Sequence, residues 1–425
     1  MSITSAMFSG VSGLLANAEG INVIGNNLAN VNTVGFKDSR MLFSDMLSVN
    51  IGNGSQEGKG TQIQKVDNLF SQGTFETTTS LTDLAIQGNS FFAVMDPNST
   101  APVNENGALL TRAGAFRLDS NQNLVNPDGY LVLDTAGNPI KFSDNAASIA
   151  TATTAVTGAT TALGTALNTQ AGTMNTAAGT LSATAGLTAT ETTAAAAIQA
   201  AATAYLTAAT TASTTPTAAN IAAAQAAFTS LSTVTAGNQA SFTTNLAAFN
   251  TFNTALTGAT TANTAATATL TAAQTQLATA NGLAFSKISS IGADGLITYL
   301  GKDGTTLNYY NASGQVGVPV SAANATTAQR LAVVTVSNPG GMDKVGGTLF
   351  KPTPASGVTS TAFSLAANTA NGTSEKIYTN SLEQSTVDMA AQFVKMILTQ
   401  RAYSANSKTI TTADEMTQEV INLKR

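Results

Sequence analysis

Apolar residues at both ends of the chain recur at the spacing of an amphipathic helix. At each end, most successive apolar residues of the series given below are three, four or seven positions apart. This spacing is the pattern of a coiled-coil seam. Ala18, Gly25 and Ala413 fill positions in the same frame. We therefore predict two long terminal helices that pair with each other and associate with further copies through Met7, Val11, Leu14, Ile21 and Leu28 at one end, and Met389, Phe393, Met396, Tyr403, Ile410, Val420 and Leu423 at the other.

The terminal helices need further burial to be stable. Gly10 and Gly13 lie in the first of them, and each glycine inside a helix costs about 1 kcal/mol relative to alanine. Two amphipathic helices also have too little surface to enclose a core, so their apolar residues stay exposed unless neighbouring copies cover them. We infer a polymer, and a helix pair packed on the chain's own globular domain is the alternative.

Residues that start and stop helices mark the expected carboxyl-terminal helix. Ser385 and Asp388 resemble a capping box at its beginning. Lys424 and Arg425 complement the negative end of its dipole.

Short runs of Val, Ile, Leu and Phe, broken by Gly, Asn, Asp and Pro, extend from about residue 35 to residue 144 and resume at residues 283–350, and the β-rich domain is expected to comprise residues 76–144 and 283–350. This texture is typical of strands and turns. Turns are predicted at residues 126–129 (Asn-Pro-Asp-Gly) and at the Asp-Gly pairs 294–295 and 303–304, because Gly adopts positive φ without steric cost. We expect one β-rich domain that is interrupted by an insertion.

Residues 35–75 and 351–380 are expected to be linker regions between this domain and the terminal helical domain, residues 1–34 plus 381–425. Four glycines between residues 52 and 60 lower the stiffness of the first region, as in a flexible linker. An ordinary surface loop is the alternative there.

Residues 145–282 form an insertion rich in Ala and Thr, with Glu191 as its only charged residue. Residues 215–217 (Thr-Pro-Thr) are typical of a helix start, with Thr215 as the cap. Gly282 is typical of a helix end. A flexible linker is the alternative, because Thr weakens helices. Heptad spacing predicts two to four long helices with Ala-rich seams through Ile149, Val156, Leu163, Phe242, Phe249, Leu256, Leu270 and Leu277.

The expected fold class is therefore multidomain α+β. Its parts are the paired terminal helices, the β-rich middle domain and a large helical insertion that forms an outer domain. The chain is long enough for several cores, since single cores usually stop growing near about 250 to 300 residues.

The composition removes most catalytic chemistry. The chain has no Cys, His or Trp, and charged residues make up 10% of it, so thiolates, imidazoles and the commonest transition-metal ligands are missing. The net charge of -5 provides no basic face for nucleic acid. No apolar run approaches the roughly 20 residues that span a bilayer. We expect no enzyme, no cofactor, no metal site, no nucleic-acid partner and no membrane insertion.

Several motifs resemble the flagellar rod, hook and hook-associated protein family. Residues 25–37 resemble its amino-terminal signature, residues 82–92, 111–116 and 124–130 its shared β-domain blocks, and residues 381–388, 400–403 and 420–423 its carboxyl-terminal helix. The resemblance covers roughly residues 1–144 and 283–425. The signature positions are Gly25, Asn26, Asn27, Asn30, Asn32, Thr33, Gly35 and Phe36.

The resemblance implies a structural subunit that the flagellar type III apparatus exports unfolded, without a cleaved signal peptide. Such subunits assemble under a hook cap protein into a homopolymer of many copies, between the distal rod protein and the hook-filament junction protein. The extracellular product is a curved, flexible tube that acts as a universal joint and transmits torque. In the family the terminal helices line the central channel and an inserted outer domain, β-rich in familiar hook proteins, faces outward.

A hook subunit is the function that the motifs favour. Residues 43–47 (Phe-Ser-Asp-Met-Leu) and the Gly-rich stretch through Gly60 are similar to hook subunits, and rod subunits usually lack a large insertion. A distal rod or other basal-body axial protein is the alternative. A secreted adhesin or surface-layer protein is more remote, since an Ala- and Thr-rich insertion would also suit an exposed stalk.

Overall fold

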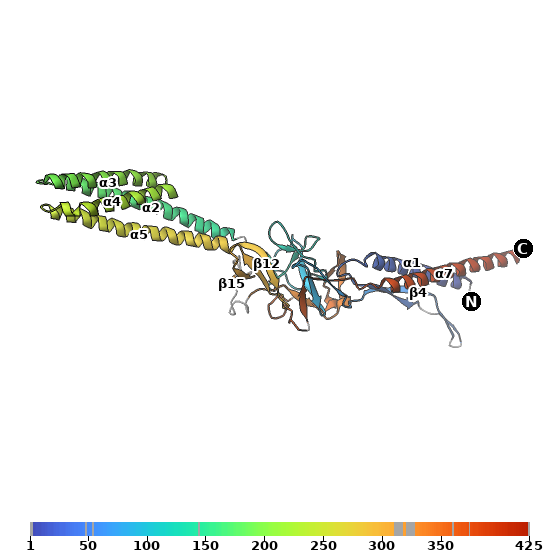
Figure 1. Cartoon of the computed structure of the whole chain (residues 1–425). Coiled ribbons are helices and arrows are strands. Elements are labelled where there is room, and N and C mark those ends of the chain that lie inside the picture. Colours follow the sequence, from blue (N-terminus) through green and yellow to red (C-terminus); the bar gives the residue numbers. More distant parts are fainter. Residues whose placement is uncertain are drawn as a thin grey trace. The chain divides into compact units, whose positions relative to one another are not determined.

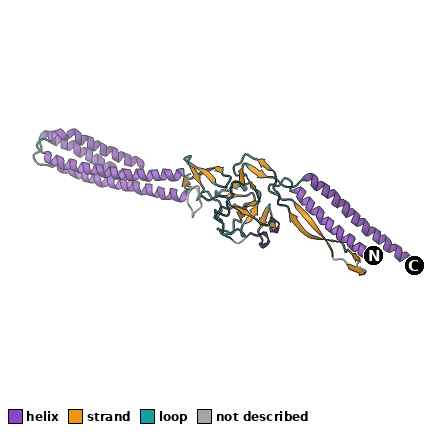
Figure 2. Ribbon diagram, turned by 90° about the horizontal axis from the view of Figure 1, so that it is seen from below, coloured by secondary structure: helices purple, strands orange, loops and turns teal. Residues whose placement is uncertain are grey.

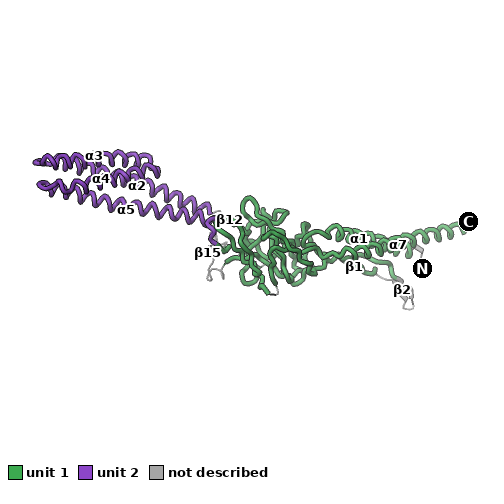
Figure 3. The backbone as a smooth tube through the Cα atoms, in the orientation of Figure 1, with its two compact units in different colours: residues 1–143, 285–301, 306–425 green, residues 144–284, 302–305 purple. Residues whose placement is uncertain are grey.

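The computed structural model describes residues 3–46, 49–52, 55–142, 145–309, 318–319, 328–358, 361–373 and 375–423. In this part of the chain the fold has two compact units (Figure 3). Unit 1 comprises Met1–Ser143, Phe285–Gly301 and Thr306–Arg425, and unit 2 comprises Asp144–Ala284 and Lys302–Thr305. The fold is multidomain, with terminal helices and a β-rich middle region (Figure 2).

Helices α1 (Ile3–Ala29) and α7 (Met389–Leu423) lie side by side in unit 1 (Figure 1). They run antiparallel, because Gly10 lies beside Ile410 and Gly20 lies beside Thr399.

Asp388 caps α7. Its Oδ1 accepts hydrogen bonds from the backbone N–H groups of Ala390 (2.9 Å) and Ala391 (3.2 Å). The prediction that Ser385 caps this helix is wrong, because the Ser385 hydroxyl accepts from the N–H of Val387 (3.3 Å), before the helix begins. The predicted dipole partners Lys424 and Arg425 lie outside the described residues.

An antiparallel hairpin follows α1. Its strands β1 (Ser39–Asp45) and β4 (Thr61–Asn68) pair in register from Ser39↔Asn68 to Asp45↔Thr61 and pack on α1. Strands β2 (Val49–Gly52) and β3 (Ser55–Glu57) pair beyond them. These strands agree with the strand and turn texture expected from residue 35 onward, and the linker role of residues 35–75 stays a prediction.

An eight-stranded antiparallel sheet dominates the described part of the β-rich region, in the order β17-β18-β8-β7-β11-β10-β9, with β16 also paired to β7. Every residue of β7 is buried. The hydrophobic core of this sheet includes Phe91 of β7 together with Leu110, Leu133, Val334 and Phe350. The bounds are β7 (Ser90–Met95), β8 (Leu109–Thr111), β9 (Arg117–Leu118), β10 (Leu124–Val125), β11 (Leu131–Val132), β16 (Val333–Thr335), β17 (Asp343–Gly346) and β18 (Leu349–Lys351).

Smaller sheets complete unit 1. Strands β12 (Phe285–Ile291), β13 (Ile297–Gly301), β14 (Thr306–Asn308) and β15 (Val318–Pro319) form a meander. Strand β6 (Leu84–Gln87) pairs with β19 (Lys376–Thr379), and β5 (Phe75–Thr77) pairs with β20 (Ser381–Glu383). Strand β19 lies within residues 351–380, and β18 ends at Lys351. The linker role expected for this range stays a prediction.

The predicted turns are confirmed. Gly129 has φ 90° and its N–H donates to the carbonyl of Asn126 (3.0 Å), which joins β10 to β11. Gly295 (φ 80°) lies between β12 and β13, and Gly304 (φ 84°) lies between β13 and β14. These positive φ values are what Gly supplies in a tight turn.

The described residues of unit 2 contain four α-helices: α2 (Ala146–Ser182), α3 (Ala189–Thr214), α4 (Ala218–Asn238) and α5 (Leu246–Gly282), with a short 3-10 turn η1 (Gln239–Ser241) before α5. Helix α2 packs against both α3 and α5, and α4 packs against α3. Thr217, not the predicted Thr215, caps α4 by accepting from the N–H of Asn220 (3.2 Å), so Pro216 precedes the cap.

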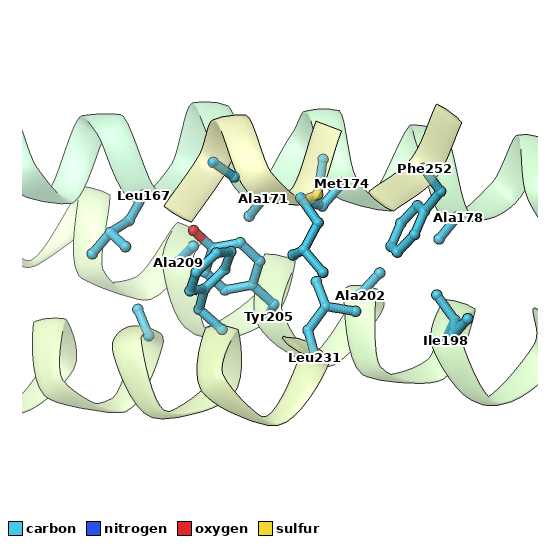
Figure 4. Close-up of a cluster of buried hydrophobic side chains, with 14 of the residues drawn as sticks. Leu167, Ala171, Met174, Ala178, Ile198, Ala202, Tyr205, Ala209, Leu231 and Phe252 are labelled. Atoms are coloured by element: carbon cyan, nitrogen blue, oxygen red, sulfur yellow. The ribbon is translucent and has the colours of Figure 1, made fainter. Parts of the chain in front are cut away.

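Small and large side chains alternate in the core of unit 2 (Figure 4). Tyr205 and Met174 fill the space that neighbouring alanines such as Ala171, Ala202 and Ala209 leave open. Exposed threonines remain helical here because their hydroxyls bond within the helix. The Thr153 hydroxyl, for example, donates to the carbonyl of Ile149 (2.7 Å), and the same four-residue bond recurs along α2, α3 and α5.

Glu191, the only charged residue between residues 145 and 282, joins two helix starts. Glu191 is fully buried, and its Oε2 accepts from the N–H of Thr188 (2.9 Å) at the start of α3. Its Oε1 accepts from the N–H groups of Thr244 (2.9 Å) and Asn245 (3.0 Å) before α5. The bonds from the Thr188 backbone, then Asn245 and Thr244, hold the pKa of Glu191 well below its usual value of 4.5.

We expect unit 2 to lose stability in acid through Glu191. Because the folded-state pKa lies below the unfolded value of 4.5, the stabilisation is complete above that pH and is lost as the pH falls. Glu191→Gln should lower the melting temperature of unit 2 at pH 7 and remove most of this pH dependence, as measured by circular dichroism. The exposed Glu415→Gln is the control. Equal pH profiles for Glu191→Gln and the wild type would contradict the role of Glu191.

Candidate assembly surface

Small side chains form the seam between α1 and α7. A Cβ at Gly13 would lie 2.6 Å from Asn406 Nδ2, and a Cβ at Gly10 would lie 3.0 Å from Ile410 Cγ1. Ala16 and Ala413 are buried on the two helices. The absence of large side chains at these positions lets the two helix backbones approach closely.

The large apolar residues predicted for this seam mostly point elsewhere. Val11 is 41% exposed, and Gly25 has no atom within 4 Å of where its Cβ would be. The seam prediction is therefore wrong for these two residues, whereas Ile410 does lie against α1. Of the other predicted self-association residues, Met7, Leu14, Ile21, Leu28 and Met396 are half-buried, and Met389, Phe393, Tyr403, Val420 and Leu423 are exposed.

The helix pair consequently presents an outer apolar face. Phe8 is 71% exposed and Leu423 is 80% exposed. Among the described residues of unit 2, Leu246, at 46% exposure, is the only exposed large apolar side chain. Exposed apolar residues that gather in one region indicate a surface that binds another protein. We use the name outer apolar face for all the exposed large apolar side chains of the pair, which lie around the helices: Phe8, Val11 and Leu15 on α1, and Met389, Phe393, Val394, Ile397, Leu398, Tyr403, Met416, Val420, Ile421 and Leu423 on α7.

The signature residues fold the chain back after α1. The buried Asn27 amide donates to the carbonyl of Ser39 (2.7 Å) and its Oδ1 accepts from the Ser39 N–H (3.0 Å), which anchors the start of β1. The Asn30 amide donates to Asn26 Oδ1 (2.8 Å), and the Thr33 hydroxyl donates to Asn30 Oδ1 (3.1 Å). Asn32 is exposed.

Gly35 and Phe36 attach this segment to the β-rich region. Gly35 has φ 69°, and a Cβ there would lie 2.5 Å from the backbone nitrogen of Ala113. Only Gly tolerates both the positive φ and this close approach. Phe36 is buried, and the Lys344 ammonium lies 4.2 Å from the centre of its ring.

A buried ion cluster lies next to Gly35. Lys37 Nζ is 2.7 Å from Glu383 Oε1, and Arg112 Nη1 is 3.3 Å from Glu383 Oε2. All three side chains are almost inaccessible to solvent, at 2%, 4% and 0% exposure for Lys37, Arg112 and Glu383. Burial lowers the pKa of Lys37 and of Arg112, and in both cases Glu383 opposes this shift.

Hydrogen bonds to the backbone complete the cluster. The Lys37 ammonium donates to the carbonyl of Ser71 (2.6 Å), and the N–H of Gly73 donates to Glu383 Oε1 (2.8 Å). The Arg112 guanidinium donates to the carbonyls of Gly88 (2.6 Å) and Ile86 (3.3 Å). Its plane also packs on Phe91, 4.8 Å from the ring centre.

Sequence reasoning missed this cluster, although a signal was present. In a chain with only 10% charged residues, each of the three motifs at residues 25–37, 111–116 and 381–388 contains a charged side chain. The distance of 346 residues between Lys37 and Glu383 hid their contact.

The described residues contain no helix with the length and apolar character needed to cross a membrane. In the same part of the chain, no three or more acidic side chains gather in an arrangement that could hold a metal ion.

Three family models match separate segments of the chain. The flagella basal body rod protein model matches residues 7–37, the flagellar hook protein FlgE/F/G D1 domain model matches residues 85–157, and the flagellar basal body rod FlgEFG protein C-terminal model matches residues 378–423. The chain belongs to the flagellar rod and hook protein family. The three matched segments of this family member contain most of α1, the central strand β7 and the whole of α7.

Both rod and hook proteins are similar to this family member. The flagellar basal-body rod protein FlgG of Bacillus subtilis is 25% identical over 99% of each chain. The flagellar hook proteins FlgE of Borreliella burgdorferi and Treponema pallidum are 35% and 37% identical, over 32% and 31% of this chain. The chain spans only about a third of those two hook proteins, at 33% and 31% of their lengths.

Proposed function

We propose that the chain is a structural subunit of the bacterial flagellar hook, and not an enzyme. Copies would assemble into a curved, flexible tube outside the cell, which transmits torque from rod to filament. The observation that carries this proposal is the outer apolar face, because these large side chains stay exposed although the two terminal helices pack on each other. Neighbouring copies are the partners that would cover them.

The predicted self-association residues keep a role in this proposal. Met389, Phe393 and Tyr403 on α7, and Val11 on α1, belong to the outer apolar face. They would contact other copies instead of forming a coiled coil within one chain.

The same face would serve a distal rod subunit, which is the second candidate. The full-length similarity to the rod protein of Bacillus subtilis favours it, whereas the hook-like residues 43–47 and the large insertion favour the hook. In either case, the implied neighbours are the adjoining axial proteins, a cap protein and the type III export apparatus.

Electron microscopy of cells that lack this chain separates the two candidates. A hook subunit requires complete basal bodies without hooks, and a rod subunit requires basal bodies with truncated rods. Normal flagella in these cells would refute both candidates.

We expect unit 2 to be dispensable for assembly. The Asn145 amide donates to the carbonyl of Ala280 (2.5 Å), so the chain enters and leaves the helices at neighbouring points and a short linker can join them. A chain without residues 146–281 should therefore still form tubes, as counted by electron microscopy. Absence of tubes, despite normal amounts of the truncated chain in the medium, would contradict a peripheral position of this insertion.

A further inference from the structure

The three segments that the family models match meet in one place. Lys37 is the last residue of the 7–37 match, Arg112 lies in the 85–157 match and Glu383 lies in the 378–423 match. We propose that their buried ion cluster is a junction that fixes the orientation of the α1-α7 pair against the β-rich region of unit 1. Its role as the point where torque passes between these parts rests on the proposed function.

Three stretches of chain between the helix pair and the sheets pass this cluster. The first is residues 30–38 after α1, where the N–H of Gly35 donates to the Glu383 carbonyl (2.8 Å). The second is residues 69–74 after β4, which receives Lys37 at Ser71 and reaches Glu383 through Gly73. The third is residues 384–388, which connect Glu383 at the end of β20 to the start of α7. Glu383 thus holds all three stretches together.

Further bonds tie these stretches to one another. The N–H of Thr386 donates to the carbonyl of Phe36 (3.2 Å), and the N–H of Gln384 donates to the carbonyl of Thr74 (2.9 Å). The N–H of Asp38 donates to the Thr386 hydroxyl (3.0 Å). The stretches form one bonded bundle and not three independent tethers.

The charges of the cluster indicate a role in orientation. Buried ion pairs recover little more than the cost of removing ions from water, so apolar residues of the same volume would stabilise the fold at least as well. Charged hydrogen bonds are directional, however, and both terminal nitrogens of the Arg112 guanidinium donate here, Nη1 to Glu383 and Ile86 and Nη2 to Gly88. Apolar contacts would let the helix pair slide against the β-rich region. The directional bonds of this cluster oppose such sliding.

Hydrogen exchange of the full-length monomer tests the junction directly. In Glu383→Gln the amide keeps its shape but loses the charge that holds Lys37 and Arg112. We expect amide exchange to rise at least about tenfold in residues 33–38 and 384–388 and to stay unchanged in β7. The control is Arg40→Gln, which breaks an exposed pair of the same 3.3 Å separation with Asp67 and should leave these amides unchanged.

A second variant covers the case in which Glu383→Gln unfolds entirely, which faster exchange in β7 would reveal. Lys37→Met leaves the Arg112–Glu383 pair in place and removes the two Lys37 bonds, to Glu383 and to the carbonyl of Ser71. It should accelerate exchange in residues 33–38 and 69–74 alone. Unchanged exchange in these segments would overturn the junction.

Swimming in a viscous medium tests the torque role. Cells with Lys37→Met should export normal amounts of the chain and swim normally in dilute medium, but slow down more than the wild type as viscosity rises. Equal slowing would refute the torque role and leave the exchange result standing. Normal swimming of cells without the chain would refute the proposed function instead.

Discussion

Gly13→Leu should separate α1 from α7 and abolish assembly. A Cβ at this position would lie 2.6 Å from Asn406 Nδ2 and 3.0 Å from Asn406 Cγ, and the rest of a leucine side chain extends further into α7. Overpacking of this kind typically costs about 1–3 kcal/mol. The pair encloses little other surface, so this loss is expected to open it. Circular dichroism should report lost helix on heating at a lower temperature, and electron microscopy should show no tubes.

The control for this variant is in the same helix. Gly25→Leu makes the same replacement where nothing lies within 4 Å of the new Cβ. It should raise helix stability by up to about 1 kcal/mol, because leucine is a better helix former than glycine. If both variants assembled equally well, the close approach at Gly13 would not matter for the pair.

Phe8→Ala should leave the monomer folded and raise the concentration needed for polymerisation. Phe8 is 71% exposed, and exposed substitutions usually change stability by less than about 0.5 kcal/mol. Burial of a phenylalanine against a neighbour is worth about 1.5–3 kcal/mol, and each 1.4 kcal/mol is about tenfold in concentration. We therefore expect a rise of about ten- to a hundredfold in the critical concentration, as measured by sedimentation.

Asn22→Ala is the matched change for Phe8→Ala. Asn22 is exposed on the same helix but is polar, so its loss should leave the critical concentration unchanged. An unaltered critical concentration in Phe8→Ala, with a monomer that melts as the wild type does, would remove Phe8 from the assembly surface.

Local patterns in the sequence predicted most elements. The heptad spacing of Leu163, Phe249 and Leu256 indicated helices in residues 145–282, and these residues now lie buried in the core of unit 2. The Asp-Gly pairs indicated turns at Gly295 and Gly304 because Gly adopts positive φ, and both residues have positive φ in the structure. Such signals are local, because periodicity and positive φ depend on residues a few positions apart.

The face on which a terminal helix packs was not predictable in this way. Periodicity selected a frame of large residues such as Val11, with Gly25 at one of its positions, but the pair meets along Gly10, Gly13 and Gly20. Each terminal helix has two sets of residues that could pack against its partner, one of small residues and one of large apolar residues. Which of them faces inward depends on how closely the partner approaches, and this is a property of both helices together.

By itself, the sequence determined the terminal helices, the turns, the β-rich middle region and the near absence of charge in residues 145–286, since each depends on neighbouring residues. Only the tertiary structure decided that glycines form the α1-α7 seam and that Lys37, Arg112 and Glu383 share one buried site. The physical reason is the separation along the chain: Lys37 and Glu383 lie 346 residues apart, and no local pattern records a contact over that distance.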